Sequence, residues 1–200
     1  MNKHNATIDF VGNMPMRWQQ TAEGLLIASN ILKERREAVM SAFKSKFLSN
    51  PTPSPELPKE GQTYWIELML TGFAIENLMK GLWLANGNTL YKDAQIPKEA
   101  IGKAHNLVDL ASRASLAVDD AERADLEMLS KIMTGVGRYP MARNETHGTG
   151  GASWTYESDK RVTAILARLQ EQLTATEAKH GERNALSRVT SFRRKIGEIT

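Results

Sequence analysis

An arginine and a histidine four positions apart are the residues of this chain best suited to catalysing a reaction together. Arg143 is followed directly by Asn144, and His147 ends the segment Arg143-Asn-Glu-Thr-His147. Metal-free RNA cleavage needs one group that moves the proton of the 2′-hydroxyl and a cation that holds the phosphate, and a histidine and an arginine supply both. Taken alone, the segment fits an exposed polar loop better than an active site.

Three further polar residues occur in strongly apolar or helix-terminal surroundings. Glu76 and Lys80 lie four residues apart in the most apolar stretch of the chain, so they share one face of a predicted helix. We interpret them first as a structural ion pair, and second as part of a polar patch that lines a ligand cleft. His105 precedes Asn106-Leu-Val-Asp-Leu110, where we expect it to cap a helix or to act on a phosphate.

The segment Gly137-Arg-Tyr-Pro140 is typical of a helix end. Glycine permits the left-handed exit from the last turn, and proline blocks continuation of the helix. Arg138 and Tyr139 are then expected to anchor the turn. The same arginine could instead bind a phosphate through two parallel hydrogen bonds, and the sequence leaves both interpretations open.

Other chemistries find little support in the sequence. Four histidines are scattered without a nearby carboxylate cluster and cysteine is absent, so we predict neither a metal site nor a cofactor. The segment Gly148-Thr-Gly-Gly151 lacks the Lys-Ser/Thr ending of a phosphate-binding loop and is interpreted as a hinge.

The absence of cysteine and of an apolar leader near Met1 is compatible with a cytoplasmic location. The most apolar stretch, 64–85, carries charged residues, which argues against a membrane span.

The elements that must position these residues are helical. Apolar residues recur with the helical period and no convincing alternating strand pattern is present, so we predict an all-α chain, a single bundle of four to five main helices. The proline-rich segment 50–58 is a stiff connection. The predicted helices cover about 15–48, 63–86, 104–116, 119–136 and 156–179, the last of them ended by Gly181.

Charge divides the predicted bundle from its C-terminal end. The net charge is +3, and residues 181–200 hold five basic and two acidic residues, which leaves 21 of each sign in 1–180. We therefore predict a flexible N-terminus over 1–14, a helical bundle over 15–180 and a basic tail over 181–200. Such a tail attracts phosphates without sequence preference, although a solvated, frayed end is the simpler interpretation.

The order of these motifs resembles that of HEPN-like domains, which are small all-helical modules. The resemblance runs from about residue 63 to 179. Glu76 and Lys80 match an acid-x-x-x-Lys element, and His105 with Leu107 and Leu110 matches a His-x-Leu-x-x-Leu helix. The Gly-Arg-Tyr-Pro segment is similar to a turn found in one subset of bacterial members.

The resemblance implies two functions, because the family contains both metal-independent ribonucleases and binding modules that lack the catalytic motif. The first is a homodimeric protein that binds a nucleotide, RNA or a partner protein through Glu76, Lys80, His105, Arg138 and Tyr139. The second is a toxin or defence ribonuclease, with an antitoxin-like partner, in which Arg143 holds the phosphate, Asn144 orients the site and His147 moves the proton. His147 comes earlier than in the family's Arg-polar-x(3–5)-His pattern, which favours the first. A helical adaptor that binds nucleic acid only through its tail is the third interpretation.

Overall fold

The predicted all-α fold is confirmed over the described part of the chain. The computed structural model describes residues 3–49, 63–97, 105–135 and 154–197. For residues 3, 49 and 180–197 it describes the backbone alone. These ranges contain helices and no strand, apart from an isolated bridge between Lys92 and Gln95. The helices are α1 (Lys3–Gly12), α2 (Pro15–Ser49), α3 (Tyr64–Ala85), α5 (Leu107–Arg113), α6 (Asp120–Thr134) and α7 (Tyr156–Gly197).

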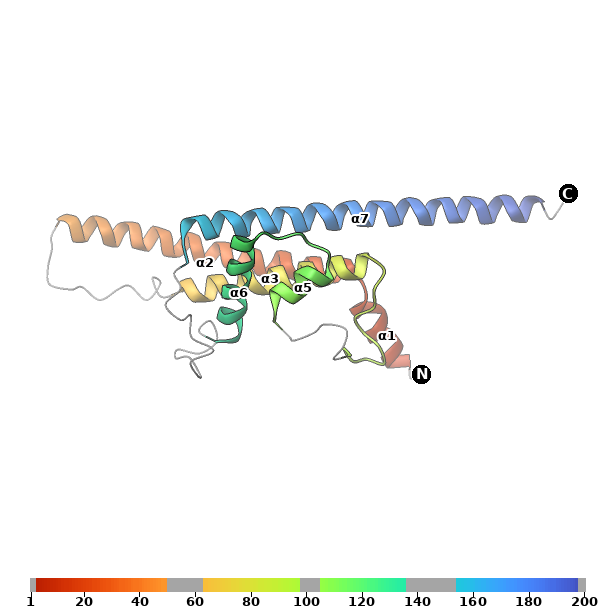
Figure 1. Cartoon of the computed structure of the whole chain (residues 1–200), viewed down its shortest axis with the longest axis horizontal. Helices are drawn as coiled ribbons and strands as arrows, with labels where there is room; N and C mark the ends of the chain where they lie inside the picture. The colour runs from red at the N-terminus through yellow and green to blue at the C-terminus, as the bar shows by residue number, and fades with distance from the viewer. Residues whose placement is uncertain (1–2, 50–62, 98–104, 136–153, 198–200) are drawn as a thin grey trace.

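Helix α3 is the centre of the bundle and packs against α2, α5, α6 and α7 (Figure 1). Its sequence is apolar almost all round, and this is typical of a helix covered on most sides. Fully buried residues on α3 meet others on α6 and α7, and together they form one continuous core. The largest fully buried side chains of these three helices are Ile75, Leu78, Met79, Leu82, Leu126, Leu129, Ile132, Met133, Ile165 and Leu169.

Within residues 1–14, which we expected to be flexible, Lys3–Gly12 form helix α1. Asn13, between α1 and α2, links this part of the chain to the segment that follows α3. Its side-chain oxygen accepts hydrogen bonds from the backbone N–H groups of Leu90 and Tyr91, and its amide donates to the Tyr91 carbonyl. These partners lie almost eighty residues away in the chain, and so the local sequence pattern does not reveal them.

Helix α6 begins where its capping pattern predicts. The Asp119 side chain accepts a hydrogen bond from the backbone N–H of Glu122, and the Glu122 carboxylate accepts one from the backbone N–H of Asp119. This reciprocal arrangement satisfies two N–H groups that would otherwise lack a partner. Ion pairs then join α6 to α7, with Arg161 bonded to Asp125 and Arg168 bonded to Glu122.

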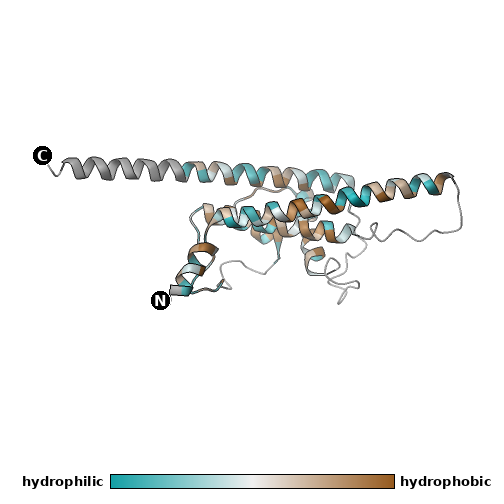
Figure 2. Cartoon of the chain, turned by 180° about the vertical axis from the view of Figure 1, so that it is seen from behind, coloured by the Kyte–Doolittle hydropathy of each residue, from teal (hydrophilic) through white to brown (hydrophobic). Residues whose placement is uncertain are grey.

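The expected helix end at Gly181 is wrong, because α7 continues to Gly197 (Figure 1). One glycine in a helix interior costs only about 1 kcal/mol relative to alanine, and no proline follows it to block the next turn. Seen from behind, the described part of α7 is largely hydrophilic, whereas hydrophobic residues run along α2 as far as its C-terminal end (Figure 2). Among the described residues, no helix combines the length and apolarity needed to cross a bilayer.

Candidate functional site

Glu76, Lys80 and His105 form one hydrogen-bonded cluster. The Glu76 side chain is only 4% exposed, and its two oxygens have different partners. Oε1 lies 2.5 Å from Lys80 Nζ, and Oε2 lies 2.8 Å from His105 Nδ1. The lysine ammonium also lies over the Trp18 ring, and the Phe73 ring meets the imidazole edge-on. The predicted ion pair is therefore present, and the structure brings His105 to it.

His105 does not cap helix α5, contrary to one sequence-based expectation. Asn106 is the N-cap residue, and its side-chain oxygen accepts a hydrogen bond from the Asp109 backbone N–H. His105 precedes it with a φ of +65°, a left-handed conformation that is uncommon for residues other than glycine. A strained backbone conformation of this kind persists only where the surrounding structure stabilises it, and such conformations are concentrated at functional sites. Here the bond to Glu76 is one of the contacts that hold the ring.

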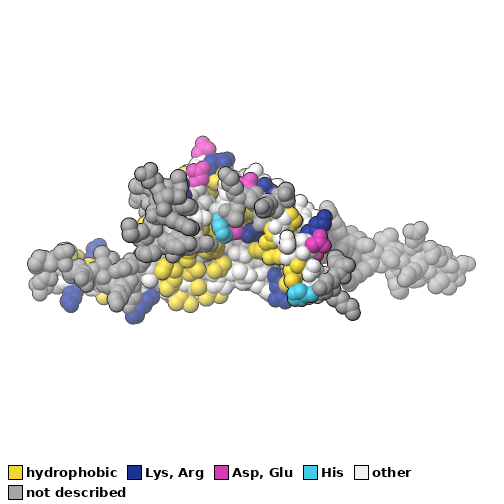
Figure 3. Space-filling view, turned by 90° about the horizontal axis from the view of Figure 1, so that it is seen from below, with side chains coloured by type: hydrophobic (Ala, Val, Ile, Leu, Met, Phe, Trp, Pro, Cys, Tyr) yellow, Lys and Arg dark blue, Asp and Glu magenta, His cyan; other side chains and the backbone are white. Residues whose placement is uncertain are grey.

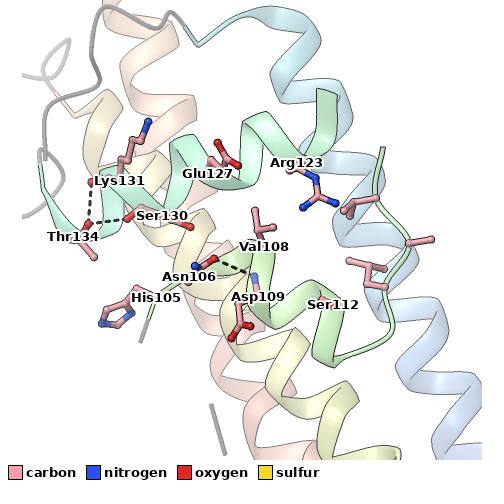
Figure 4. A pocket seen from close by; sticks show the side chains of 13 residues that line it. His105, Asn106, Val108, Asp109, Ser112, Arg123, Glu127, Ser130, Lys131 and Thr134 are labelled. Atoms are coloured by element: carbon pink, nitrogen blue, oxygen red, sulfur yellow. Dashed lines mark hydrogen bonds between the residues drawn. The ribbon is translucent and has the colours of Figure 1, made fainter. Parts of the chain in front are cut away.

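A groove with a volume of ≈ 850 Å³ runs between α5 and α6, and His105 lies at one end of it (Figure 4). Glu76 and Lys80 are not among the residues that line this groove, and Glu76 is connected to it through its hydrogen bond with His105. The side chains of Asn106, Ser130 and Thr134 are engaged in hydrogen bonds with the backbone. The remaining lining residues are Val108, Asp109, Ser112, Leu116, Ala117, Val118, Arg123, Glu127 and Lys131.

Three charged side chains of α6 line the groove and have no polar partner among the described residues. Arg123, Glu127 and Lys131 follow one another at intervals of four residues, so they lie along the same side of the helix. None of the three side chains forms a hydrogen bond or ion pair with another described residue. Their charges are therefore available to a ligand. These three residues were not predicted as site residues, although their four-residue spacing beside the apolar stripe of α6 is visible in the sequence.

Asp109 belongs to the same groove but is already paired. Its carboxylate accepts a hydrogen bond from Arg113 Nε at 2.9 Å, one turn further along α5. Both side chains of this pair are about one-third exposed, so the contact is weak and open to exchange with a bound ligand. The groove consequently combines hydrogen-bond acceptors on α5 with cations on α6, above an apolar floor that includes Val108 and Leu116.

Several predicted site residues lie outside the described residues. These are Arg138 and Tyr139 of the Gly-Arg-Tyr-Pro segment, and Arg143, Asn144 and His147 of the predicted catalytic segment. Their proposed roles remain predictions. Within the described ranges, no three histidine, aspartate or glutamate side chains lie close enough together to hold a metal ion.

No protein-family model matches the chain, and no curated protein or solved structure gives a significant match. The all-helical architecture and the cluster around Glu76 therefore stand on this structure and sequence alone.

Proposed function

We propose that this chain is a HEPN-like helical protein that binds a short stretch of single-stranded RNA in the groove between α5 and α6. The observation that carries the proposal is a row of three charged side chains on α6, Arg123, Glu127 and Lys131, beside an apolar groove floor; none of them is paired with another described residue. Phosphates dominate the affinity of proteins for nucleic acid, and unpaired arginine and lysine side chains are their usual partners.

The spacing of the two cations suits a strand better than a single phosphate. Arg123 and Lys131 are eight residues apart, which corresponds to about 12 Å along a helix at a rise of ~1.5 Å per residue. Each would contact a different phosphate of one strand. Glu127, between them, would accept hydrogen bonds from ribose hydroxyl or base amino groups, while Val108 and Leu116 contact the faces of the bases.

His105 gives the groove a hydrogen-bonding group whose orientation is fixed. An ionised Glu76 accepts the hydrogen of Nδ1, so in the neutral ring the other nitrogen, Nε2, is left as an acceptor. We propose that Nε2 accepts a hydrogen bond from a ribose hydroxyl. This contact would distinguish RNA from DNA, because DNA lacks the 2′-hydroxyl.

The groove is tested by comparing two double charge reversals in an RNA-binding titration. Arg123→Glu with Lys131→Glu removes both groove cations, whereas Arg17→Glu with Lys160→Glu changes the net charge equally at exposed positions elsewhere. The groove variant should bind RNA at least about tenfold more weakly. The slope of log affinity against log salt concentration should also become shallower by roughly 1.4, because each of the two lost phosphate contacts contributes ~0.7. Equal losses in both variants would mean that binding depends on overall charge alone.

Deleting residues 181–200 separates this proposal from the charge-only adaptor. The tail holds all of the positive excess, so the adaptor interpretation requires the deletion to abolish RNA binding. Our proposal requires the groove to retain specific binding, with only the salt-sensitive nonspecific component reduced. Loss of all RNA binding on deletion would therefore favour the adaptor.

The ribonuclease function remains a second proposal, supported by the family resemblance of the segment that contains Arg143, Asn144 and His147. Wild-type protein and a His147→Ala variant would be incubated with RNA in the presence of a chelator. Cleavage by the wild type alone supports a metal-independent nuclease, with an antitoxin-like protein as the expected partner. Intact RNA in both samples leaves the binding function. A homodimer and a cytoplasmic location belong to both proposals.

A further inference from the structure

The C-terminal part of helix α2 extends past the beginning of α3 and of α7 (Figure 1). Arg36 of α2 donates to the carboxylate of Glu67, in the first turn of α3, at 2.9 and 3.0 Å. The residues that follow Arg36 therefore reach beyond the start of α3. Residues 37–49 form this extension of α2, and at a rise of ~1.5 Å per residue it is about 20 Å long.

The face of α2 that packs on the bundle continues along this extension. Residues at intervals of seven lie near one face of a helix, and two such rows run along α2. One row consists of Ala22, Ser29, Arg36 and Phe43, and the other of Leu26, Lys33, Met40 and Phe47. Ala22 is fully buried in the core, and Ser29 Oγ donates to the Glu67 backbone oxygen. Lys33 lies 3.7 Å from Asp159 of α7. The earlier members of both rows thus contact the bundle, and the later ones continue the same face beyond it.

A groove with a volume of ≈ 480 Å³ lies on the extension, and among the described residues α2 alone lines it. Its apolar residues are Met40, Phe43 and Phe47, and Phe47 is 42% exposed. Within the bundle, α3 covers the corresponding face of α2. An apolar surface that is exposed beyond the core and bordered by polar residues is typical of a site to which another protein binds.

The charged residues along the extension are mainly basic. Between residues 38 and 48, Lys44 and Lys46 are the only charged residues, and neither forms an ion pair or hydrogen bond with another described residue. Glu37 also lines the groove, but it lies at the end next to the bundle, 4.0 Å from the Arg36 guanidinium. Beyond Glu37 the extension therefore presents two cations and no anion.

We propose that this extension of α2 binds an acidic, amphipathic helix of a partner protein. The contact between α2 and α3 supports this choice, because there the two rows are covered by a helix that supplies a carboxylate to Arg36. The partner helix would lie beyond the start of α3 and pack its apolar residues against Phe43 and Phe47. Lys44 and Lys46 flank the two rows, one on each side, and these are the positions from which charged residues select a partner helix.

The test is a fluorescence polarisation titration of the full chain with two labelled synthetic peptides. Both peptides would be amphipathic helices of about three heptads with leucine at the two core positions of each heptad. One carries glutamate at the flanking positions and the other carries lysine. The glutamate peptide should bind at least about tenfold more tightly, because the lysine peptide would place like charges beside Lys44 and Lys46.

A double charge reversal shows whether the preference arises at the extension. Lys44→Glu with Lys46→Glu should reverse it, so that the lysine peptide binds more tightly than the glutamate peptide. Arg17→Glu with Lys160→Glu changes the net charge equally at exposed positions elsewhere, and should keep the preference for glutamate.

A matched pair of phenylalanine variants tests the apolar contact. Phe47→Ser should weaken binding of the glutamate peptide by roughly tenfold, as expected for the loss of an aromatic anchor at an interface. Phe10→Ser replaces a phenylalanine of α1 that is 67% exposed, and should leave the affinity unchanged.

Several results would overturn the proposal. Equal affinity for the two peptides, binding of neither, or a preference that the reversal of Lys44 and Lys46 leaves unchanged would each do so. Co-sedimentation with vesicles that contain phosphatidylserine tests a membrane surface, and sedimentation velocity tests a second copy of this chain. An association of either kind that Phe47→Ser abolishes would assign the extension to that occupant instead. The extension shares no lining residue with the α5–α6 groove, so these results are independent of RNA binding there.

Discussion

At the scale of single residues, the central feature is a buried carboxylate with two partners. The four-residue spacing of Glu76 and Lys80 was enough to predict their pairing, because both lie on one helix face. The contact with His105 was not predictable in the same way. It joins residues 29 positions apart, and sequence spacing carries no information about a contact made by tertiary packing.

Replacing Glu76 by glutamine should destabilise the fold strongly. The Lys80 ammonium, only 12% exposed, would lose the partner that compensates its burial. Removing one member of a buried ion pair costs about 3–5 kcal/mol, and we expect a value near the lower end because Lys80 reaches some solvent. Urea unfolding measures this loss. Glu157→Gln breaks an exposed pair with Lys160, so it is the matched control and should have little effect on stability. Similar losses of stability in both variants would contradict the role of Glu76 as the partner of a buried Lys80.

Tyr64 should make the stability of the fold fall at high pH. Its folded-state pKa of about 12 lies above the ordinary value of 10.0, mainly because of burial. The neutral phenol is favoured by folding, so its contribution is complete below pH ~10 and is lost as the pH rises through ~12. A phenolate absorbance titration should show a late component that Tyr64→Phe lacks. Superimposable titration curves would show that the phenol is not shielded.

At the scale of helices, the helical repeat of apolar residues predicted α2 and α6, whereas α3 was predicted from a stretch that is apolar almost all round. Their ends were less predictable where the stop signal is weak. Gly181 alone does not end α7, whereas the capping pair Asp119 and Glu122 starts α6 as expected. A reciprocal cap supplies specific hydrogen bonds, but a lone glycine only makes a helix slightly less favourable.

Two glycines should respond oppositely to alanine. A Cβ at Gly24 of α2 would meet no atom within 4 Å, so Gly24→Ala should stabilise the protein by about 0.5–1 kcal/mol through helix propensity. A Cβ at Gly72 of α3 would lie 2.6 Å from Met133 Sδ, in the core. Gly72→Ala should therefore cost roughly 1–3 kcal/mol through overpacking. Thermal unfolding of both variants checks the prediction, and a stabilised Gly72→Ala protein would show that α3 and α6 are packed less closely.

At the scale of the whole molecule, charge is dispersed over the described surface seen from below. Isolated basic and acidic groups lie among hydrophobic and neutral ones, without a continuous basic patch (Figure 3). From the sequence we predicted only that residues 1–180 carry equal numbers of basic and acidic residues, which does not fix where the charges lie. The location of the groove was not predictable, because it requires the short helix α5 to lie against α6, and a seven-residue helix gives only a weak periodic signal.

The proposed homodimer should depend on the exposed side of α2. Ile27 and Ile31 are each 61% exposed and lie one turn apart, with the small Ala28 beside them. Two such surfaces on identical copies would allow close packing of the helices. Sedimentation velocity should show a dimer for the wild type and a monomer for Ile27→Lys with Ile31→Lys. Phe10→Lys on α1 is the control; a wild-type monomer at all concentrations would contradict the dimer.

The most direct test of the proposed groove is to map where RNA contacts the protein by NMR. We predict that a short single-stranded RNA shifts the backbone amide signals of residues 105–112 and 123–134, and that the matching DNA strand shifts them less because it lacks the 2′-hydroxyl. Signals from the opposite side of the bundle, such as those of Ile27 and Ile31 on α2, should stay in place. Shifts confined to residues 181–200, with none along α5 and α6, would contradict the account.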